Sequence, residues 1–470
     1  MKTSMARLLP IMALFMVLFS YAGERGAVAQ QEPPPKPNIV MVLTDDMRAD
    51  DVRFTPKVRR LVGGEGMTFE NAFVTDSVCC PSRATFLTGL YAHNHNVKGN
   101  YPRTGSVLRF NEGGHDEHTV AAWLDGAGYQ TGLFGNYMKS YNGTYVPPGW
   151  DEWQAWAGGP RFSDNGRVYR GAGKHFTDFV FDGAEDFVAS AAADDEPFFA
   201  YLAPQTPHPP ANPPAGGYSK LYPKLKLPRD PAFNERDLSD KPDWLRSKPL
   251  LNARQMNDMD LLHRKRARSL RALDDRFEAL HQRIEAAGEL ENTYFIFTSD
   301  NGFHMGEHRM FPMKQSAYEE DTKIPLLISG PDVERASEDK IVLNNDFAPT
   351  LAELSGAEES RPVDGRSYAP LLRGENPSPW RSAFLIEKWD KLLMPLSYKG
   401  IRTNAGWTYV EYGAGARGGQ QELYNVRRDP HQINNLIRGG KYGKKTYWKL
   451  NNRLEALSDC EAQTCVRAEN

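Results

Sequence analysis

Short, mostly apolar runs that recur along the chain constrain its fold more than any other feature. Their length and continuous hydrophobicity are typical of strands buried on both faces. They span residues 38–43, 130–134, 197–202, 293–298 and 324–328. Helical patterns lie between them, and the clearest is the three-and-four spacing of Leu270, Leu273, Phe277, Leu280 and Ile284. This alternation predicts an α/β fold whose mostly parallel sheet is flanked by helices.

The C-terminal part of the chain has a different pattern. After about residue 375, short aromatic and β-branched runs are separated by Gly-rich turns, at residues 383–389, 398–402, 407–411 and 422–426. They predict a small antiparallel sheet, so we expect an α/β domain over residues 38–374 and a subdomain over residues 375–470. Residues 204–250 contain eleven prolines and little periodicity, which indicates a long surface excursion near the functional site.

The N-terminus has the form of an export signal. Two basic residues precede an apolar run at residues 8–19, and residues 27–29, Ala-Val-Ala, fit the small-residue cleavage pattern. We expect a signal peptide over residues 1–29, followed by a Pro-rich leader over residues 30–37. The apolar run is too short to span a bilayer, and no cysteine follows it for lipidation. The sequence therefore predicts a secreted protein with no membrane anchor in its mature form.

Composition and charge exclude several classes of protein. The 57 Lys and Arg residues against 60 Asp and Glu give a formal charge of −3, so a nucleic-acid binder with a basic face is not expected. A basic run at residues 263–268 leads directly into the amphipathic helix, and we interpret it as a solvated helix face. Four cysteines are too few to staple 470 residues, so the fold must be stabilised by its own core.

Candidate chemistry is concentrated in residues 76–89. A Pro-Ser pair after Cys80 suits the first turn of a helix, so we expect Cys79 just ahead of a helix N-terminus. Free backbone N–H groups and the positive end of the helix dipole favour an anion there, and Arg83, one turn on, can point at the same anion. The spacing alone leaves a second interpretation open, in which Cys79 and Cys80 are buried thiols or disulfide partners.

This stretch resembles the signature of a known family. Residues 79–83, Cys-Cys-Pro-Ser-Arg, match the Cys-x-Pro-Ser-Arg motif of type I sulfatases, and residues 84–89 match its continuation. The resemblance extends over nearly all of the mature chain and is strongest to N-acetylglucosamine-6-sulfatases and bacterial arylsulfatases. It implies the alkaline phosphatase-like fold, with the sulfatase catalytic domain over residues 38–374.

The resemblance also implies a nucleophile. In this family the first cysteine of the motif, here Cys79, is oxidised to formylglycine by a formylglycine-generating enzyme, and the hydrated aldehyde attacks sulfur. A serine would leave a stable sulfate ester, whereas the second hydroxyl of a geminal diol can expel sulfate from the covalent sulfo-enzyme. The implied function is hydrolysis of a sulfate ester, either an aryl sulfate or the 6-sulfated N-acetylglucosamine of a glycan.

Oxygen ligands follow two of the predicted strands. Asp45 and Asp46 follow the first strand, and Asp300 and Asn301 follow the strand at residues 293–298. Without a Cys/His cluster, such ligands suit Ca²⁺ or Mg²⁺ better than zinc. Taken alone, an Asp-Asp or Asp-Asn pair after a strand is more often a helix N-cap or a turn. The resemblance implies Ca²⁺ at these four positions, with formylglycine at position 79 as a further ligand.

Three side chains match the family's positions around the sulfate: Arg83, His208 and Lys314. Prolines flank His208 and fix its loop, which makes this histidine a candidate for contacting sulfate and protonating the leaving oxygen. Lys314 matches the family's sulfate-binding lysine. Further candidates to line the pocket are His93, His95, His304 and His308.

One position departs from the family's pattern. Most relatives carry Gly-Lys after the strand at residues 130–134, and that lysine contacts both nucleophile and sulfate. This chain has Asn136 there, and its next lysine is Lys139. We expect both residues to bind substrate, and our hypothesis is that Lys139 partly restores the missing charge.

The remaining cysteines, Cys460 and Cys465, are close enough to form a small disulfide loop in an exported protein. Two other function classes stay open. A phosphatase or phosphonate hydrolase of the alkaline phosphatase-like superfamily would share fold and metal ligands, but usually has Thr or Ser as its nucleophile. A non-catalytic relative that binds sulfated glycans would have the fold without a modified Cys79.

Overall fold

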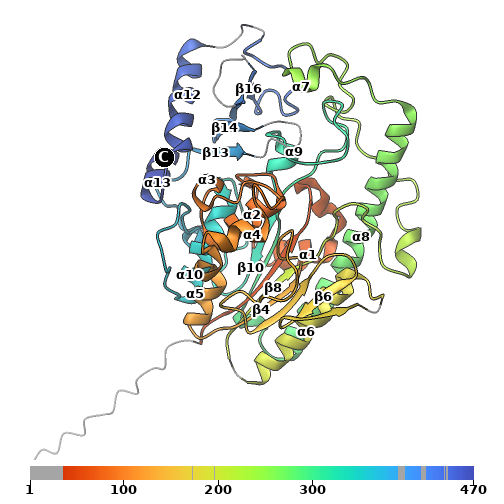
Figure 1. Cartoon of the computed structure of the whole chain (residues 1–470), viewed down its shortest axis with the longest axis vertical. Helices are drawn as coiled ribbons and strands as arrows, with labels where there is room; N and C mark the ends of the chain where they lie inside the picture. Colours follow the sequence, from red (N-terminus) through yellow and green to blue (C-terminus); the bar gives the residue numbers. More distant parts are fainter. Residues whose placement is uncertain are drawn as a thin grey trace, which may run out of the picture. The chain divides into compact units, whose positions relative to one another are not determined.

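All five predicted runs form strands of one large sheet in the computed structural model (Figure 1). They are β1 (Asn38–Thr44), β4 (Gln130–Gly135), β8 (Phe198–Ala203), β9 (Thr293–Ser299) and β10 (Leu326–Ser329). The same sheet contains β2 (Met67–Phe69), β5 (Glu152–Trp156), β6 (Arg161–Asp164), β7 (Arg167–Arg170) and β11 (Ala336–Glu338). Its strand order is β11-β2-β10-β9-β1-β8-β4-β5-β6-β7.

The structure describes residues 35–171, 173–194, 196–389, 397–413, 420–438, 440 and 443–470. The expected signal peptide and residues 30–34 of the leader lie outside the described residues. The elements below belong to one unit, residues 36–470. Within the described part of the chain, no helix is both long and apolar enough to cross a membrane.

The centre of the large sheet is parallel, as predicted, but β10 is not. From β9 through β1, β8 and β4 to β5, each strand runs parallel to its neighbour. β10 pairs antiparallel with both β9 and β2. A parallel return needs a long crossover, usually a helix, whereas the fully described connection from β9 to β10 contains only α9 (Glu319–Thr322). The sheet is therefore mixed.

Helices cover both faces of the large sheet (Figure 1). On one face, alternate residues of β1 pack with α6 (Phe176–Ala193) and α8 (Ala253–Ala286). On the other, the intervening residues pack with α2 (Cys79–Thr88), α5 (Val120–Gly126) and α10 (Phe347–Ser355). Successive side chains of a strand point to opposite faces, which explains the continuous apolar run of β1.

The predicted amphipathic helix is confirmed as the second half of α8. Its five stripe residues, from Leu270 to Ile284, are buried against the sheet. Other helices are α1 (Pro56–Val58), α3 (Ala92–His95), α4 (Ser106–Glu112), α7 (Asp243–Arg246), α11 (Ala369–Leu372), α12 (Lys444–Ser458) and α13 (Gln463–Glu469). Short 3-10 or π segments are η1 (Ala49–Phe54), η2 (Arg59–Gly63), η3 (His115–His118), η4 (Gly217–Lys220), η5 (Leu290–Asn292) and η6 (Asn344–Asp346). β3 (Ala72–Phe73) and β12 (Val342–Leu343) form a two-stranded sheet.

The small C-terminal sheet is antiparallel, as predicted. It consists of β13 (Ala383–Lys388), β14 (Tyr398–Thr403), β15 (Trp407–Tyr412) and β16 (Gln421–Asn425), in that order. Leu450, Leu454 and Leu457 of α12 pack into its core. Figure 1 shows α12 beside this sheet. The domain boundary at residue 375 stays a prediction.

The proline-rich excursion of residues 204–250 contains short helical segments, η4 and α7. It packs on the connection from β9 to β10. The Asn234 N–H donates to the Gly306 carbonyl, and the His308 N–H donates to the Ala232 carbonyl, both at 2.8 Å. The excursion thereby holds this connection, which also carries Lys314.

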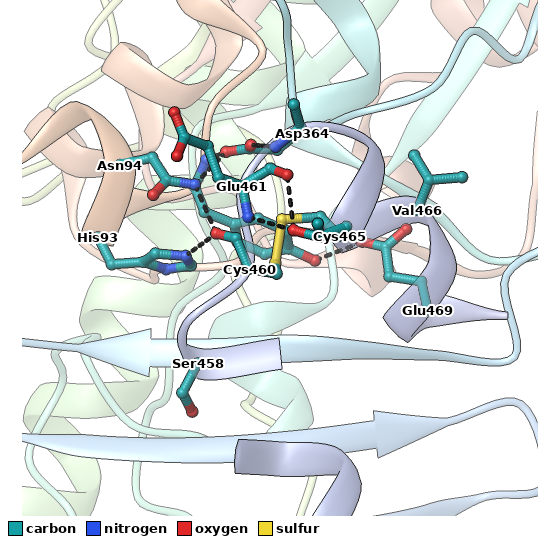
Figure 2. Close-up of a disulfide and its surroundings, with 12 residues drawn as sticks. His93, Asn94, Asp364, Ser458, Cys460, Glu461, Cys465, Val466 and Glu469 are labelled. Carbon is teal, nitrogen blue, oxygen red and sulfur yellow. Dashed lines mark hydrogen bonds between the residues drawn. A yellow bond between two sulfur atoms is a disulfide. The ribbon is translucent and has the colours of Figure 1, made fainter. Parts of the chain in front are cut away.

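The predicted disulfide between Cys460 and Cys465 is confirmed (Figure 2). It closes the turn between α12 and α13. The Cys460 carbonyl accepts hydrogen bonds from His93 Nε2 at 2.9 Å and Asn94 Nδ2 at 3.0 Å. The closed turn therefore ties α3 to the C-terminal helices.

Candidate active site

β1 and β9 bring four oxygen-bearing side chains to one edge of the large sheet. The two strands are parallel neighbours in a register that pairs their last residues, so Asp45 and Asp46 lie beside Asp300 and Asn301. The Asp46 N–H donates to Asp300 Oδ1 at 3.1 Å, and Asn301 Nδ2 donates to Asp46 Oδ1 at 2.7 Å. Asp46 has a φ of 66°, a left-handed conformation that is uncommon for non-glycine residues and concentrates at functional sites.

α2 places Cys79 against these side chains. The helix begins at Cys79, with Val78 as its N-cap, so it starts one residue earlier than predicted. Cys79 Sγ lies 2.8 Å from Lys314 Nζ and 3.8 Å from Asp45 Oδ1. Cys79 and Cys80 are both free thiols, which excludes disulfide pairing. Burial raises the pKa of Cys79 well above its usual range.

Arg83 lies one turn along α2 and is 1% exposed. The sequence predicted that it points at a bound anion, but its guanidinium is engaged by protein groups. Nε donates to Asp300 Oδ2 at 2.9 Å, Nη2 donates to Asp45 Oδ2 at 3.2 Å, and Nη1 donates to the Asn136 carbonyl. Arg83 therefore fixes the two acids and balances part of their charge.

The buried charges shift one another's pKa values. Burial, with the negative charge of Asp45, raises the pKa of Asp300 to about 6. Burial also acts to raise the pKa of Asp45, but neighbouring positive charges, led by His208 and Lys314, outweigh it and hold this pKa well below its usual range. These opposite shifts reflect a site in which acidic groups are crowded together.

Lys314 and His208 reach the cluster from separate loops. Lys314 forms an ion pair with Asp46, and its Nζ lies 3.7 Å from Asp45 Oδ1. His208 Nδ1 lies 2.7 Å from the Pro209 carbonyl, which can only accept, so we assign the proton to Nδ1. Its Nε2 lies 3.7 Å from Asp46 Oδ2, and the side chain is 35% exposed. His208 thus has one nitrogen at the cluster and an edge open to solvent.

The donors of this site fit a hard divalent cation. Ligand atoms of Asp45, Asp46 and His208 converge, as do those of Asp45, Cys79 and Asp300. Asn301 Oδ1 is buried and has no hydrogen-bond partner. Such an orphaned acceptor is costly unless a ligand satisfies it. Carboxylate and amide oxygens are the ligands that Ca²⁺ and Mg²⁺ prefer.

Asn136 and Lys139 differ in how they approach the cluster. Asn136 is buried and its Nδ2 donates to Asp45 Oδ2 at 2.9 Å. Lys139 is half-buried, and its ammonium lies 5.4 Å from the ring centre of Trp156. The charge of Lys139 also helps to lower the pKa of Asp45, so it acts on the cluster from a distance.

The four other candidate histidines have partners away from the cluster. They contact Glu387 (His93), Thr85 (His95), Asp321 (His304) and Glu235 (His308). Within the described residues, none of their hydrogen bonds reaches Cys79 or the three aspartates. These histidines support the surrounding loops.

Arg266 fixes two loops of the site by hydrogen bonds, a role that the sequence did not predict. Its Nη2 donates to the Asp46 carbonyl and to Asp51 Oδ2, both at 2.7 Å, and its Nη1 donates to the Pro207 carbonyl at 3.1 Å. One guanidinium therefore fixes both the loop of Asp46 and the loop of His208.

The interpretation of residues 263–268 as a solvated helix face is wrong for His263 and Arg266, which are both buried. A signal was present in the sequence. The three-and-four spacing of the apolar stripe, continued backward from Leu270, reaches Arg266 and then His263. Both side chains therefore belong to the buried face of α8.

The chain is similar to known sulfatases over most of its length. Residues 37–357 match the family described as Sulfatase, and residues 306–460 match N-sulphoglucosamine sulphohydrolase, C-terminal. The chain is 32% identical to N-acetylglucosamine-6-sulfatase of Homo sapiens over 516 residues, covering 98% of this chain and 91% of that protein. It is also 32% identical to the extracellular sulfatase SULF-1 homolog of Drosophila melanogaster over 369 residues, covering 75% of this chain. The matched region is 33% of the Drosophila protein, so the chain spans a third of that relative.

A solved structure of a protein in complex with its substrate, D-glucosamine-2-N,6-O-disulfate, has the same fold. The TM-score is 0.69 at 22% sequence identity, covering 92% of this chain and 98% of that one. At this identity the likeness shows the fold alone. It confirms the predicted alkaline phosphatase-like architecture, with its small C-terminal sheet.

Proposed function

The chain belongs to the sulfatase family of sulfuric ester hydrolases, and we propose that it cleaves sulfate esters with a nucleophile made from Cys79. The observation that carries this proposal is the position of Cys79. It lies in the first turn of α2, between the ammonium of Lys314 and the carboxylate of Asp45. An anionic ester at this helix N-terminus would meet the positive end of the helix dipole and the ammonium of Lys314.

The nucleophile in this proposal is formylglycine, made from Cys79 by a formylglycine-generating enzyme. Its hydrated aldehyde supplies a hydroxyl that attacks sulfur and can later release sulfate. Cys80 is not an equivalent target, because its Sγ accepts a hydrogen bond from the Lys139 N–H at 3.2 Å on another side of α2. The modification therefore concerns one thiol of the pair.

We propose Ca²⁺, with Mg²⁺ as the alternative, as the cofactor. Asp45, Asp46, Asp300 and Asn301 would hold the ion, and the orphaned Asn301 Oδ1 supports this assignment. The modified residue at position 79 would be a further ligand. When bound, the ion supplies a Lewis acid that offsets negative charge at the sulfate oxygens.

Other side chains have separate roles in the proposal. Lys314 places a positive charge 2.8 Å from the reacting position at residue 79, where it can neutralise a sulfate oxygen. His208 Nε2 is free to hold a proton, because Nδ1 is committed to the Pro209 carbonyl, and it can protonate the leaving oxygen. Arg83 positions Asp45 and Asp300.

Asn136 and Lys139 are proposed to bind substrate, with Lys139 partly restoring the charge that Asn136 lacks. Lys139→Ala should then lower kcat/KM, and Asn136→Lys should raise sulfate affinity in that background. The positive charge of Lys139, which helps to lower the pKa of Asp45 from a distance, supports this proposal. Unchanged kinetics of Lys139→Ala would contradict it.

The proposed substrates are aryl sulfates or 6-sulfated N-acetylglucosamine of glycans, and the proposed location is outside the cytoplasm. The name of the human relative and the sulfated glucosamine bound in the solved structure support the substrate class. The apolar run at residues 8–19 and the disulfide between Cys460 and Cys465 support export, because disulfides persist in oxidising compartments.

The test compares Cys79→Ala with the matched variant Cys80→Ala in enzyme matured by its native host. We expect sulfate release by Cys79→Ala to fall at least about a thousandfold, whereas Cys80→Ala stays active. Undiminished release by Cys79→Ala would contradict the proposal. Faster hydrolysis of a phosphate monoester than of any sulfate ester would favour the phosphatase alternative. Binding of sulfated glycans without turnover would favour the non-catalytic one.

A further inference from the structure

An aromatic row crosses the edge of the large sheet next to the active site. Trp156 of β5 pairs with Phe162 of β6, which in turn pairs with Tyr169 of β7. Paired residues of neighbouring strands share a face, so the three rings lie side by side. Phe176 and Phe179 of α6 stand against this row, with ring centres 6.0 and 4.4 Å from that of Phe162.

The row and α6 enclose a groove of about 590 Å³. All five aromatic residues line it, together with Gln154, Gln205 and the charged side chains of Lys174, Asp182 and Asp186. Aromatic walls with a few polar side chains are typical of sites that bind small organic ligands. Tyr169 is 39% exposed, so part of its ring is open to solvent.

Two contacts connect the groove to the active site. The carbonyl of Gln205 accepts a hydrogen bond from the His208 N–H at 2.7 Å, so one wall belongs to the histidine loop. At the other wall, the ammonium of Lys139 lies 5.4 Å from the ring centre of Trp156. These two contacts place the groove beside the active site.

The hairpin of β6 and β7 is locally basic. Residues 161–170 contain three arginines and one acid, in a chain that has more acidic than basic residues overall. Arg167 lies on the same face as Tyr169, because they are two apart on one strand. The side chain of Arg167 is exposed and lies across from Asp164 of β6. It makes no hydrogen bond or ion pair with the residues that the structure describes. Arg167 is therefore a cation beside the groove, whose own lysine, Lys174, is paired with Asp182.

We propose that this groove binds a second sugar of a sulfated oligosaccharide, adjacent to the sugar whose ester is cleaved. The ring would pack on Tyr169 and Trp156, and a sulfate of that second sugar would meet Arg167. This proposal rests on the sulfatase function proposed above and narrows its substrate to glycans longer than a monosaccharide. Free aryl sulfates and sulfated monosaccharides leave the groove unused.

The test compares Tyr169→Ala and Arg167→Ala with Trp448→Ala, which truncates an aromatic side chain that is 57% exposed on α12. Substrates are a tetrasaccharide containing 6-sulfated N-acetylglucosamine, the sulfated monosaccharide, and 4-nitrophenyl sulfate. We expect Tyr169→Ala to raise KM for the tetrasaccharide about tenfold more than KM for the monosaccharide. Arg167→Ala should raise KM for the tetrasaccharide less than Tyr169→Ala does. It should also weaken the salt dependence of that KM. Trp448→Ala should have the same KM as the wild type for all three substrates.

Calorimetry of tetrasaccharide binding to the Cys79→Ala variant measures binding in the groove independently of catalysis. Weaker binding after adding Tyr169→Ala supports the groove, even if the wild-type enzyme releases no sulfate and the proposed function fails. Equal KM changes for tetrasaccharide and monosaccharide, or unchanged tetrasaccharide binding, would overturn the proposal. So would an equal loss in Trp448→Ala, which would indicate an unspecific effect of aromatic truncation.

Discussion

Two buried arginines in this molecule each contact two carboxylates, yet their surroundings differ. Arg83 contacts Asp45 and Asp300 at the edge of the large sheet. Arg381, which precedes β13, contacts Asp346 and Glu469 between η6 and α13. All six side chains are buried.

In the cluster of Arg381, Asp346 and Glu469, the negative charges are balanced by positive ones. Arg366 adds a second positive charge by donating to Glu469 Oε2 at 2.7 Å, and both carboxylates also accept neutral donors. The Asp346 carboxylate accepts the N–H groups of Leu343 and Arg366, and Glu469 accepts the hydroxyl of Tyr91 at 2.5 Å. Two acids are thus matched by two arginines.

In the cluster of Arg83, Asp45 and Asp300, negative charges outnumber positive ones. Asp46 adds a third acid, Lys314 is the second buried cation, and Asn301 Oδ1 lacks a partner. Burying uncompensated charge and an unsatisfied acceptor is costly unless a ligand completes the arrangement. The Arg381 cluster is thus complete without a ligand, whereas the Arg83 cluster has the excess acid and the free acceptor that could hold a cation.

The largest expected difference concerns activity. Asp300→Asn should lower kcat/KM for a sulfate ester at least about a thousandfold, because it removes a charged ligand from the cation site. Added Ca²⁺ should then no longer raise the melting temperature. The matched variant Asp346→Asn should lower the melting temperature and keep the Ca²⁺ response. The comparison would be contradicted if Asp346→Asn lost the Ca²⁺ response and Asp300→Asn kept it.

A second difference concerns stability. Arg381→Leu should lower the free energy of unfolding by about 3–5 kcal/mol, because Asp346 and Glu469 would stay buried without their partner. Urea denaturation measures this. Arg53→Leu is the control, since its ion pair with Asp50 is exposed and should contribute less than about 1 kcal/mol. Equal effects of the two substitutions would contradict the structural role of Arg381.

The smallest expected effect concerns pH. Burial acts to lower the pKa of His93, but the charge of Glu387 outweighs it and raises this pKa to about 9. A histidine whose folded pKa is raised stabilises the fold fully below its unfolded pKa of about 6.5, and this stabilisation is lost as pH rises through about 9. The contribution is about 3 kcal/mol. His93→Gln should flatten the pH dependence of stability in this window, and an unchanged slope would show that the contact with Glu387 is unimportant.

The sequence predicted much of this site because its chemistry follows strand ends. Asp45, Asp46, Asp300 and Asn301 all come directly after apolar runs, and parallel neighbours bring such ends together. The signature at Cys79 likewise predicted a helix, which begins within one residue of the expected position.

What the sequence did not predict depends on long-range pairing. The partners of Arg83 and Arg266 come from other elements. Local spacing could place Arg266 on the buried face of α8, but it could not identify the groups that either guanidinium contacts. The antiparallel direction of β10 follows from a connection without a long helix, which the apolar run alone does not encode. The aromatic row of Trp156, Phe162 and Tyr169 likewise appears only once the register of three strands is known.

The most direct test of the account is the mass of the peptide that contains Cys79, in protein made by its native host. We expect a peptide in which the sulfur of Cys79 is exchanged for oxygen with loss of two hydrogens, as formylglycine requires, while Cys80 stays a thiol. A peptide that carries only unmodified thiol at both positions, from protein that nevertheless releases sulfate, would contradict it.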